Sequence, residues 1–297
     1  MRYRAFPILL ILFFFGAGRT EALDWVRLHN LVGQMDYQEA QEYLANDVDQ
    51  IEQKYIKGLI NLKYFNNHNA KLIFEDILVS DPSVYEARWG VAEALKGLHD
   101  YDLSEQILGA LIDEKKNFAP VIMSSAHLAY LRNSLKEVLA LTGRIIRMKS
   151  DQVDSETILY AHGLYSAAHG MLTVDAGPLS IAFHGYTSVR HLKIVRKLDP
   201  ESFIHYFGWG NFYLLAPKVF GGDLKKAEDY YHKVIEMNPN FPDVYVRLAE
   251  IYKRQGEMQK YQQFINKALE LDPQNPLADD ILNLKCEFMC LEKKQRP

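Results

Sequence analysis

Cysteine is almost missing from this sequence, which carries only Cys286 and Cys290 among its 297 residues. Two thiols four residues apart in one helical segment cannot supply the several cross-links that hold a disulfide-rich fold together. We therefore exclude a disulfide framework and expect two thiols on one helix face.

The sequence also lacks clustered cations, strand patterns and linkers. Its formal net charge is −4, and its Lys and Arg residues are interspersed with acidic ones. Nucleic-acid phosphates require clustered positive charge, so we expect no nucleic-acid partner. No segment alternates apolar and polar residues over the length of a strand, and no Pro-rich or Ser/Gly-rich linker divides the chain. These absences predict one continuous all-α domain.

The N-terminus has a secretory signal pattern. Arg2 and Arg4 precede an apolar run at 8–15 that is too short to span a membrane comfortably, and residues 20–22 offer a small-x-small cleavage site. We predict that residues 1–22 are a signal peptide. The mature chain, 23–297, would then be a periplasmic or secreted bacterial protein with no membrane span after cleavage. The alternative is that residues 1–22 are retained as an anchor.

The clearest internal pattern lies in 242–273. A first helix is predicted by an i, i+3, i+4, i+7 apolar face formed by Tyr245, Leu248, Ala249 and Tyr252. Gly256 interrupts it, and a second helix follows that ends before Pro273, because the residue before proline is disfavoured in the α region. Pro239 and Pro273 are 34 positions apart, the period of tetratricopeptide repeats.

Similar helix pairs run through the rest of the chain. The best repeats are 48–82, 203–239 and 242–273, whereas 118–150 keeps helical periodicity without the signature. A truncated first pair at 23–44 and a last amphipathic helix at 276–291 are expected to cap the two ends. We predict that 23–297 is a single tetratricopeptide-type α-solenoid, with antiparallel helix pairs forming a right-handed superhelix and a concave face available for binding.

The unit 203–239 departs from the regular repeat. Its first helix is extended by residues 214–216 up to Pro217. An inserted loop follows, whose distinctive residues are Pro217, Phe220, Gly221, Gly222 and the expected N-cap Asp223. This arrangement resembles the periplasmic T component of TRAP (tripartite ATP-independent periplasmic) transporters. The resemblance implies an exported helical protein with a groove or pore, which pairs with a periplasmic solute-binding protein and presents ligands to a transporter.

A candidate groove follows from the helix register. If Tyr206, Trp209 and Tyr213 face the core, the opposite side presents Phe207, Asn211 and Leu214. The next unit presents Val246, Glu250 and Lys253 by the same register. This mixture suits a peptide or a small apolar ligand. The alternative is that Phe207 and Leu214 are buried by the adjacent repeat or the inserted loop.

Signals for catalysis are weak. Five histidines gather in the middle of the chain, but no carboxylate or cysteine completes a familiar ligand set for His162, His169, His184, His191 and His205. Ser124, Ser125 and His127 share one helix and lack an orienting acid. We therefore predict no metal, no cofactor and no enzymatic activity.

These patterns favour an exported tetratricopeptide binding or scaffold protein with protein partners. The resemblance implies that it is accessory to TRAP-type solute uptake. One alternative is a protein-only scaffold in envelope assembly. The other is a metal-dependent enzyme built on a helical-repeat scaffold.

Overall fold

The computed structural model describes residues 23–46, 50–174 and 176–283. Within these ranges the chain is entirely helical, without strands. The predicted signal peptide at 1–22, both cysteines and the remainder of the predicted capping helix beyond residue 283 lie outside the described residues. The helices are α1 (Trp25–Gln34), α2 (Tyr37–Ala45), α3 (Ile51–Lys63), α4 (Asn67–Ser80), α5 (Tyr85–Gly97), α6 (Tyr101–Glu114), α7 (Ala119–Leu131), α8 (Leu135–Ile146), α9 (Ser155–Met171), α10 (Pro178–Leu198), α11 (Phe203–Leu215), the 3-10 turn η1 (Lys218–Phe220), α12 (Leu224–Met237), α13 (Pro242–Gln255), α14 (Met258–Leu271) and α15 (Pro276–Leu282).

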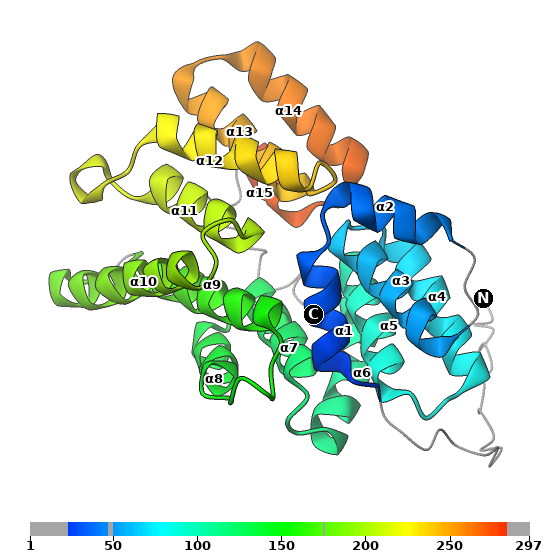
Figure 1. Cartoon of the computed structure of the whole chain (residues 1–297). Coiled ribbons are helices and arrows are strands. Elements are labelled where there is room, and N and C mark those ends of the chain that lie inside the picture. The colour runs from blue at the N-terminus through cyan, green and yellow to red at the C-terminus, as the bar shows by residue number, and fades with distance from the viewer. Residues whose placement is uncertain (1–22, 47–49, 175, 284–297) are drawn as a thin grey trace, which may run out of the picture.

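Local sequence sets where these helices begin and end. Side-chain oxygens of Asp36, Asp100 and Asp154 accept hydrogen bonds from the first turns of α2, α6 and α9, which satisfies amides that have no partner within the helix. At the other end, α10, α12 and α14 each stop two residues before a proline. The result is a series of antiparallel pairs that stack in chain order (Figure 1).

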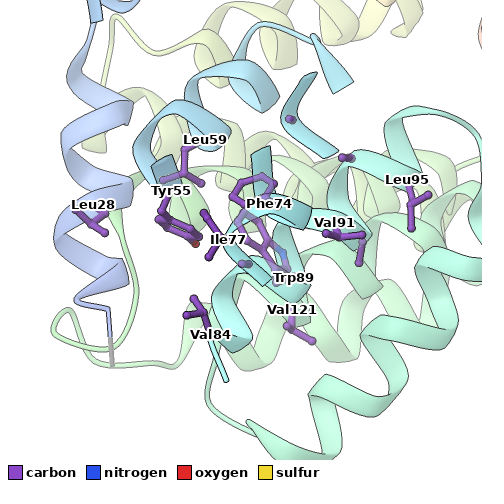
Figure 2. Close-up of a cluster of buried hydrophobic side chains, with 14 of the residues drawn as sticks. Leu28, Tyr55, Leu59, Phe74, Ile77, Val84, Trp89, Val91, Leu95 and Val121 are labelled. Atoms are coloured by element: carbon purple, nitrogen blue, oxygen red, sulfur yellow. The ribbon is translucent and has the colours of Figure 1, made fainter. Parts of the chain in front are cut away.

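Glycines inside the first helices of the pairs let neighbouring helices approach closely. A Cβ placed on Gly58 or Gly90 would come 2.5 Å from the Phe74 ring, and one on Gly210 would come 2.6 Å from Tyr231. Phe74 and Tyr231 are fully buried as a consequence. Figure 2 shows Phe74 between Tyr55 and Trp89 in the larger N-terminal core.

The first helix pair does not cap the stack as expected. Helix α1 lies across the concave side, against α3 and α9, and Figure 1 shows it in front of the neighbouring helices. Its Leu28 joins the buried cluster drawn in Figure 2. A ten-residue helix with only one apolar stripe is stabilised mainly by burying that stripe, and Leu28 and Val32 are buried in this position.

Candidate functional site

The two ends of the superhelix meet each other. The Asn238 side-chain amide donates a hydrogen bond to the Lys63 carbonyl oxygen at 2.8 Å, although the residues are 175 positions apart. The Phe65 ring stacks on the Phe241 ring with centroids 5.0 Å apart. One repeat further along, His99 Nε2 lies 2.9 Å from Asp272 Oδ1. These contacts close the solenoid into a ring, and its blue and orange ends lie side by side in Figure 1.

Two of the closing residues have an unusual backbone conformation. Phe65 and His99 have φ values of 59° and 65°, in the left-handed region that glycine or asparagine usually occupies. Gly256 and Asn133 occupy the corresponding turns of other pairs. Phe65 and His99 therefore carry a local conformational cost in the same turns whose side chains join the ends of the ring.

Helix α1 contacts the first helices of several pairs inside this ring. His29 Nε2 lies 2.9 Å from the Tyr55 hydroxyl on α3, and the His29 ring is 5.1 Å from the Trp89 ring on α5. Asn30 Oδ1 accepts hydrogen bonds from the amide and hydroxyl of Ser155 at the start of α9, both at 2.8 Å. One part of the concave surface is thus already occupied by the chain's own helix.

The rest of the concave space is a cavity of about 2620 Å³. Pockets for drug-sized molecules are typically about 300–1,000 Å³, so this space is large enough for a segment of another protein. Its most apolar wall is formed by α9, α10 and α11, through side chains that include Leu164, Ile181, Val189, Phe207, Phe212 and Leu215.

The charge of the cavity is strongly one-sided. Among the described residues, nine acidic ones line it: Asp36, Glu93, Asp154, Glu156, Asp199, Glu201, Glu236, Asp243 and Asp272. Three Lys or Arg residues of the same described lining oppose them, and each has a partner in the chain. Lys63 donates to three backbone carbonyls, Lys96 lies 2.6 Å from Glu93, and Arg247 lies 2.9 Å from Glu250. Of the nine acids, Glu93 is paired with Lys96 and Glu236 with Lys233, so the described lining keeps an acidic excess while its three cations are already bound.

One buried polar network spans α5 and α7. The Ser124 hydroxyl donates to Glu93 at 2.5 Å and accepts from the Trp89 indole at 3.0 Å. Burial would raise the pKa of Glu93, but the charge of Lys96 and the hydrogen bonds from Lys96 and Ser124 outweigh burial and lower it. The sequence shows no acid beside Ser124 on its own helix. In the structure the carboxylate that contacts Ser124 is Glu93, on a different helix.

This network does not resemble an activated nucleophile. The Ser124 proton is directed at a carboxylate, and within the described chain no hydrogen bond joins Ser124 to His127. Burial and the nearby Lys96 lower the pKa of His127 to about 3, so its imidazole is neutral. The arrangement holds Ser124 and Glu93 in place on the cavity surface.

The predicted groove residues separate into two groups. Phe207 and Asn211 line the cavity, and Asn211 also accepts a hydrogen bond from the Tyr231 hydroxyl at 2.8 Å. Leu214 and Val246 lie in the C-terminal core instead. Glu250 is buried between Arg247 and Arg254, and Lys253 lies over the Tyr261 ring.

The register on α13 accounts for this difference. Asp243 and Arg247 are the α13 side chains that line the cavity. Val246 lies in the C-terminal core, to which α15, packed on α13, also contributes. Three further cavity residues were not predicted, although they share a recognisable sequence position. Asp199, Asn238 and Asp272, each immediately before a proline, all line the cavity.

The inserted loop is a compact turn at the cavity edge. Gly221 has φ 103°, and a Cβ on Gly222 would overlap the Ala216 carbonyl oxygen at 1.8 Å, so both positions require glycine. Asp223 accepts hydrogen bonds from the Lys225 and Lys226 amides at the start of α12. Pro217 and Phe220 line the cavity.

The central histidines form two facing pairs between α9 and α10. Because these helices are antiparallel, His162 meets His191 with their Nδ1 atoms 2.9 Å apart, and His169 meets His184 at 2.7 Å. Each contact needs one N–H donor and one unprotonated acceptor, which favours neutral rings. Burial, together with electrostatic repulsion from a protonated His162 or His169 and from Arg190, disfavours protonation of His191 and lowers its pKa to about 4. No cluster of three or more candidate metal ligands occurs among the residues that the structure describes.

Comparison with known proteins supports the repeat assignment. Residues 221–283 match the tetratricopeptide repeat family model. No curated protein matches this sequence. The prediction of an all-α, tetratricopeptide-like solenoid is confirmed by the helix pairs of the described residues and by this family match.

Several solved structures are similar to the chain. Pseudomonas aeruginosa PilF is 11% identical, with a TM-score of 0.45, over 82% of this chain and 99% of that one. TTC0263, a TPR protein of Thermus thermophilus, is 16% identical, with a TM-score of 0.34, over 80% of this chain and 95% of that one. YrrB, a TPR protein described as having an unusual peptide-binding site, is 14% identical, with a TM-score of 0.35, over 72% of this chain and 98% of that one.

Among the described residues, no helix has the length and apolar character needed to cross a membrane.

Proposed function

We propose that this protein is a non-enzymatic tetratricopeptide scaffold that holds a basic and apolar segment of a protein partner in its ring-shaped cavity. The observation that carries the proposal is the acidic excess of the described cavity lining, in which all three Lys and Arg residues are engaged by the chain itself. Such a surface favours a partner that brings its own cations, since charge complementarity selects partners and orients them.

The apolar wall supplies the second half of the recognition. Phe207, Phe212 and Leu215 on α11 face the same cavity as Ile181 and Val189 on α10. Burial of apolar side chains against such a wall contributes roughly 25 cal/mol per Å² removed from water. A segment with apolar anchors flanked by Lys or Arg therefore matches both the apolar wall and the acidic residues of the lining.

The more specific form of the proposal is an exported protein that serves TRAP-type solute uptake, with a periplasmic solute-binding protein as its partner. Two sequence features support it: the signal pattern at 1–22 and the inserted Pro217–Asp223 loop. The export part is tested by the intact mass of protein recovered from the periplasm. Loss of residues 1–22 supports cleavage, and a mass that includes them contradicts it.

The partner is tested by affinity capture from a periplasmic extract followed by mass spectrometry. The matched variants are Gly185→Trp and Gly109→Trp, because a Cβ at either helical position meets open space. Gly185 lines the cavity, whereas Gly109 lies on exposed α6.

We expect wild type and Gly109→Trp to retain the same protein and Gly185→Trp to lose it. A solute-binding protein as the retained partner supports the TRAP role. Retention of envelope-assembly proteins alone favours the protein-only scaffold. Equal capture by both variants contradicts binding in the cavity.

A further inference from the structure

Helix α10 carries an exposed stripe of which only Tyr186 belongs to the cavity lining. Residues at i, i+4, i+7, i+11, i+14 and i+18 fall within about 40° of one line along a helix. On α10 these are Leu179, Phe183, Tyr186, Arg190, Lys193 and Lys197, which we call the α10 stripe. Leu179 is 89% exposed, Phe183 62% and Tyr186 71%, and the three cations are exposed as well.

The two halves of the α10 stripe differ in chemical character. Its N-terminal half is apolar, and its C-terminal half is cationic. Helix α10 contains no Asp or Glu among its 21 residues, so the three cations have no acidic partner on their own helix. Three large apolar side chains and three cations thus face solvent together.

A second element extends the apolar half. The 3-10 turn η1 exposes Val219 (86%) and Phe220 (66%) beside Lys218. In Figure 1 the connection between α11 and α12, which contains this turn, lies at the same left-hand edge of the molecule as one end of α10. Tyr186 and Phe220 also both belong to the cavity lining.

Protruding side chains of this kind suit a lipid surface better than a protein surface. Core contacts between proteins require shape complementarity, with pockets that receive each projecting residue. A bilayer interface imposes no such shape and accepts apolar side chains from separate elements, with aromatic residues at the headgroup level and cations on anionic lipids.

We propose that the α10 stripe and η1 dock this protein on an anionic membrane surface. Leu179, Phe183, Val219 and Phe220 enter the boundary between headgroups and acyl chains, and Tyr186 lies at the headgroup level. Arg190, Lys193 and Lys197 contact lipid phosphates. The docking surface is cationic whereas the cavity is acidic, so the two surfaces take different partners.

The test is cosedimentation of the full chain with vesicles at low salt. One set of vesicles is phosphatidylcholine, and the other contains equal parts of phosphatidylcholine and phosphatidylglycerol. We expect binding to the anionic vesicles only, with a loss of affinity as salt rises. The variant Lys193→Glu with Lys197→Glu should bind at least about tenfold more weakly, because each cation near an anionic surface contributes about fivefold. The variant Leu179→Ser with Phe183→Ser should bind at least about tenfold more weakly as well, because it removes two large apolar side chains from the lipid boundary.

The control variants make the same kinds of substitution at exposed positions outside the α10 stripe. Leu72→Ser with Val79→Ser alters two exposed apolar residues on α4, and Lys116→Glu with Lys136→Glu alters two exposed lysines. Both controls should bind within about twofold of wild type. All variants keep residues 1–22 unchanged, so that segment cannot account for a difference.

Three results would overturn the proposal: no binding of wild type to anionic vesicles, equal binding to both lipid compositions, or the same loss in the control variants. Binding of the stripe to an acidic protein segment without any vesicle binding would assign it to a protein partner instead. Thermal melting of every variant, expected within a few degrees of wild type for exposed positions, excludes misfolding as the cause.

Discussion

The Lys63 ammonium nitrogen lies 2.8 Å from the Val32 carbonyl oxygen, so a residue of helix α3 holds the C-terminal end of helix α1. The same nitrogen donates to the carbonyls of Gly33 at 3.0 Å and Met35 at 2.8 Å. These carbonyls lie in the last turn and at the C-cap of α1, where the Val32 carbonyl also accepts from the Met35 amide at 3.2 Å. A cation is favourable at this negative end of the helix dipole.

Replacing Lys63 should therefore release α1 from the concave surface. For Lys63→Met we expect a loss of about 3 kcal/mol in unfolding free energy, because hydrogen bonds to a charged group contribute about 1.5–3 kcal/mol. Amide hydrogen exchange should show faster exchange in α1 than elsewhere. The control is Lys71→Met, which removes a partly exposed pair with Glu75 on α4 and should cost below about 1 kcal/mol. Equal costs in the two variants would mean that Lys63 does not hold α1.

Closure of the ring depends on side chains in left-handed turns. For Phe65→Gly combined with His99→Gly we expect lower stability, by about 1–2 kcal/mol, because the Phe241 stack and the Asp272 contact are lost although backbone strain is relieved. The radius of gyration from small-angle scattering should increase.

The control for ring closure is Asn133→Gly, which changes the same kind of turn at φ 57°. Its stability should change by less than about 1 kcal/mol, because only the backbone preference is altered. An unchanged radius of gyration in the Phe65 and His99 double variant would show that these residues do not close the ring.

Whether a feature of this fold can be predicted from the sequence depends on how far apart in the chain its contacting residues lie. Pro239, Gly256 and Pro273 act on their own neighbours, so the repeat period and the fold class can be inferred from local patterns. Helix α1 could not be placed this way, since a short helix with Leu28 and Val32 on one face looks the same whether it caps a stack or fills a groove. The Asn238 contact with Lys63 depends on the summed curvature of every pair between them.

The candidate site also depends on contacts between residues that are far apart in the sequence. The seven-residue spacing of His162 and His169 predicts that they share a helix face, yet only the antiparallel packing of α9 and α10 shows that each one meets a second histidine. The cavity acids come from loops and helices far apart in sequence. Their placement is a property of the closed ring.

The facing histidines predict a dependence of stability on pH. The folded-state pKa of His191 is about 4, below its usual value near 6.5, so the unfolded chain binds a proton first as pH falls. This contribution to stability is complete above about pH 6.5 and is lost as pH falls toward 4, by up to about 1.4 kcal/mol per pH unit.

His191→Gln cannot titrate but can still hydrogen-bond to His162. Between pH 6 and 5 we expect its unfolding free energy to fall by about 1 kcal/mol less than that of wild type. His68→Gln, which changes an exposed histidine on α4, is the control and should leave the slope unchanged. Identical slopes for wild type and His191→Gln in urea titrations would contradict the role of the pair.

The most direct test of cavity binding is photo-crosslinking from inside it. A benzophenone amino acid placed at Gly185 would project into open space in the cavity, and the same residue at Gly109 would project from exposed α6. Irradiation of cells that express each variant should crosslink a protein partner from position 185 and not from position 109, through a Lys- or Arg-containing segment identified by mass spectrometry. Crosslinks to the same partner from position 109 alone, or none from position 185 while the partner is still captured, would contradict the account.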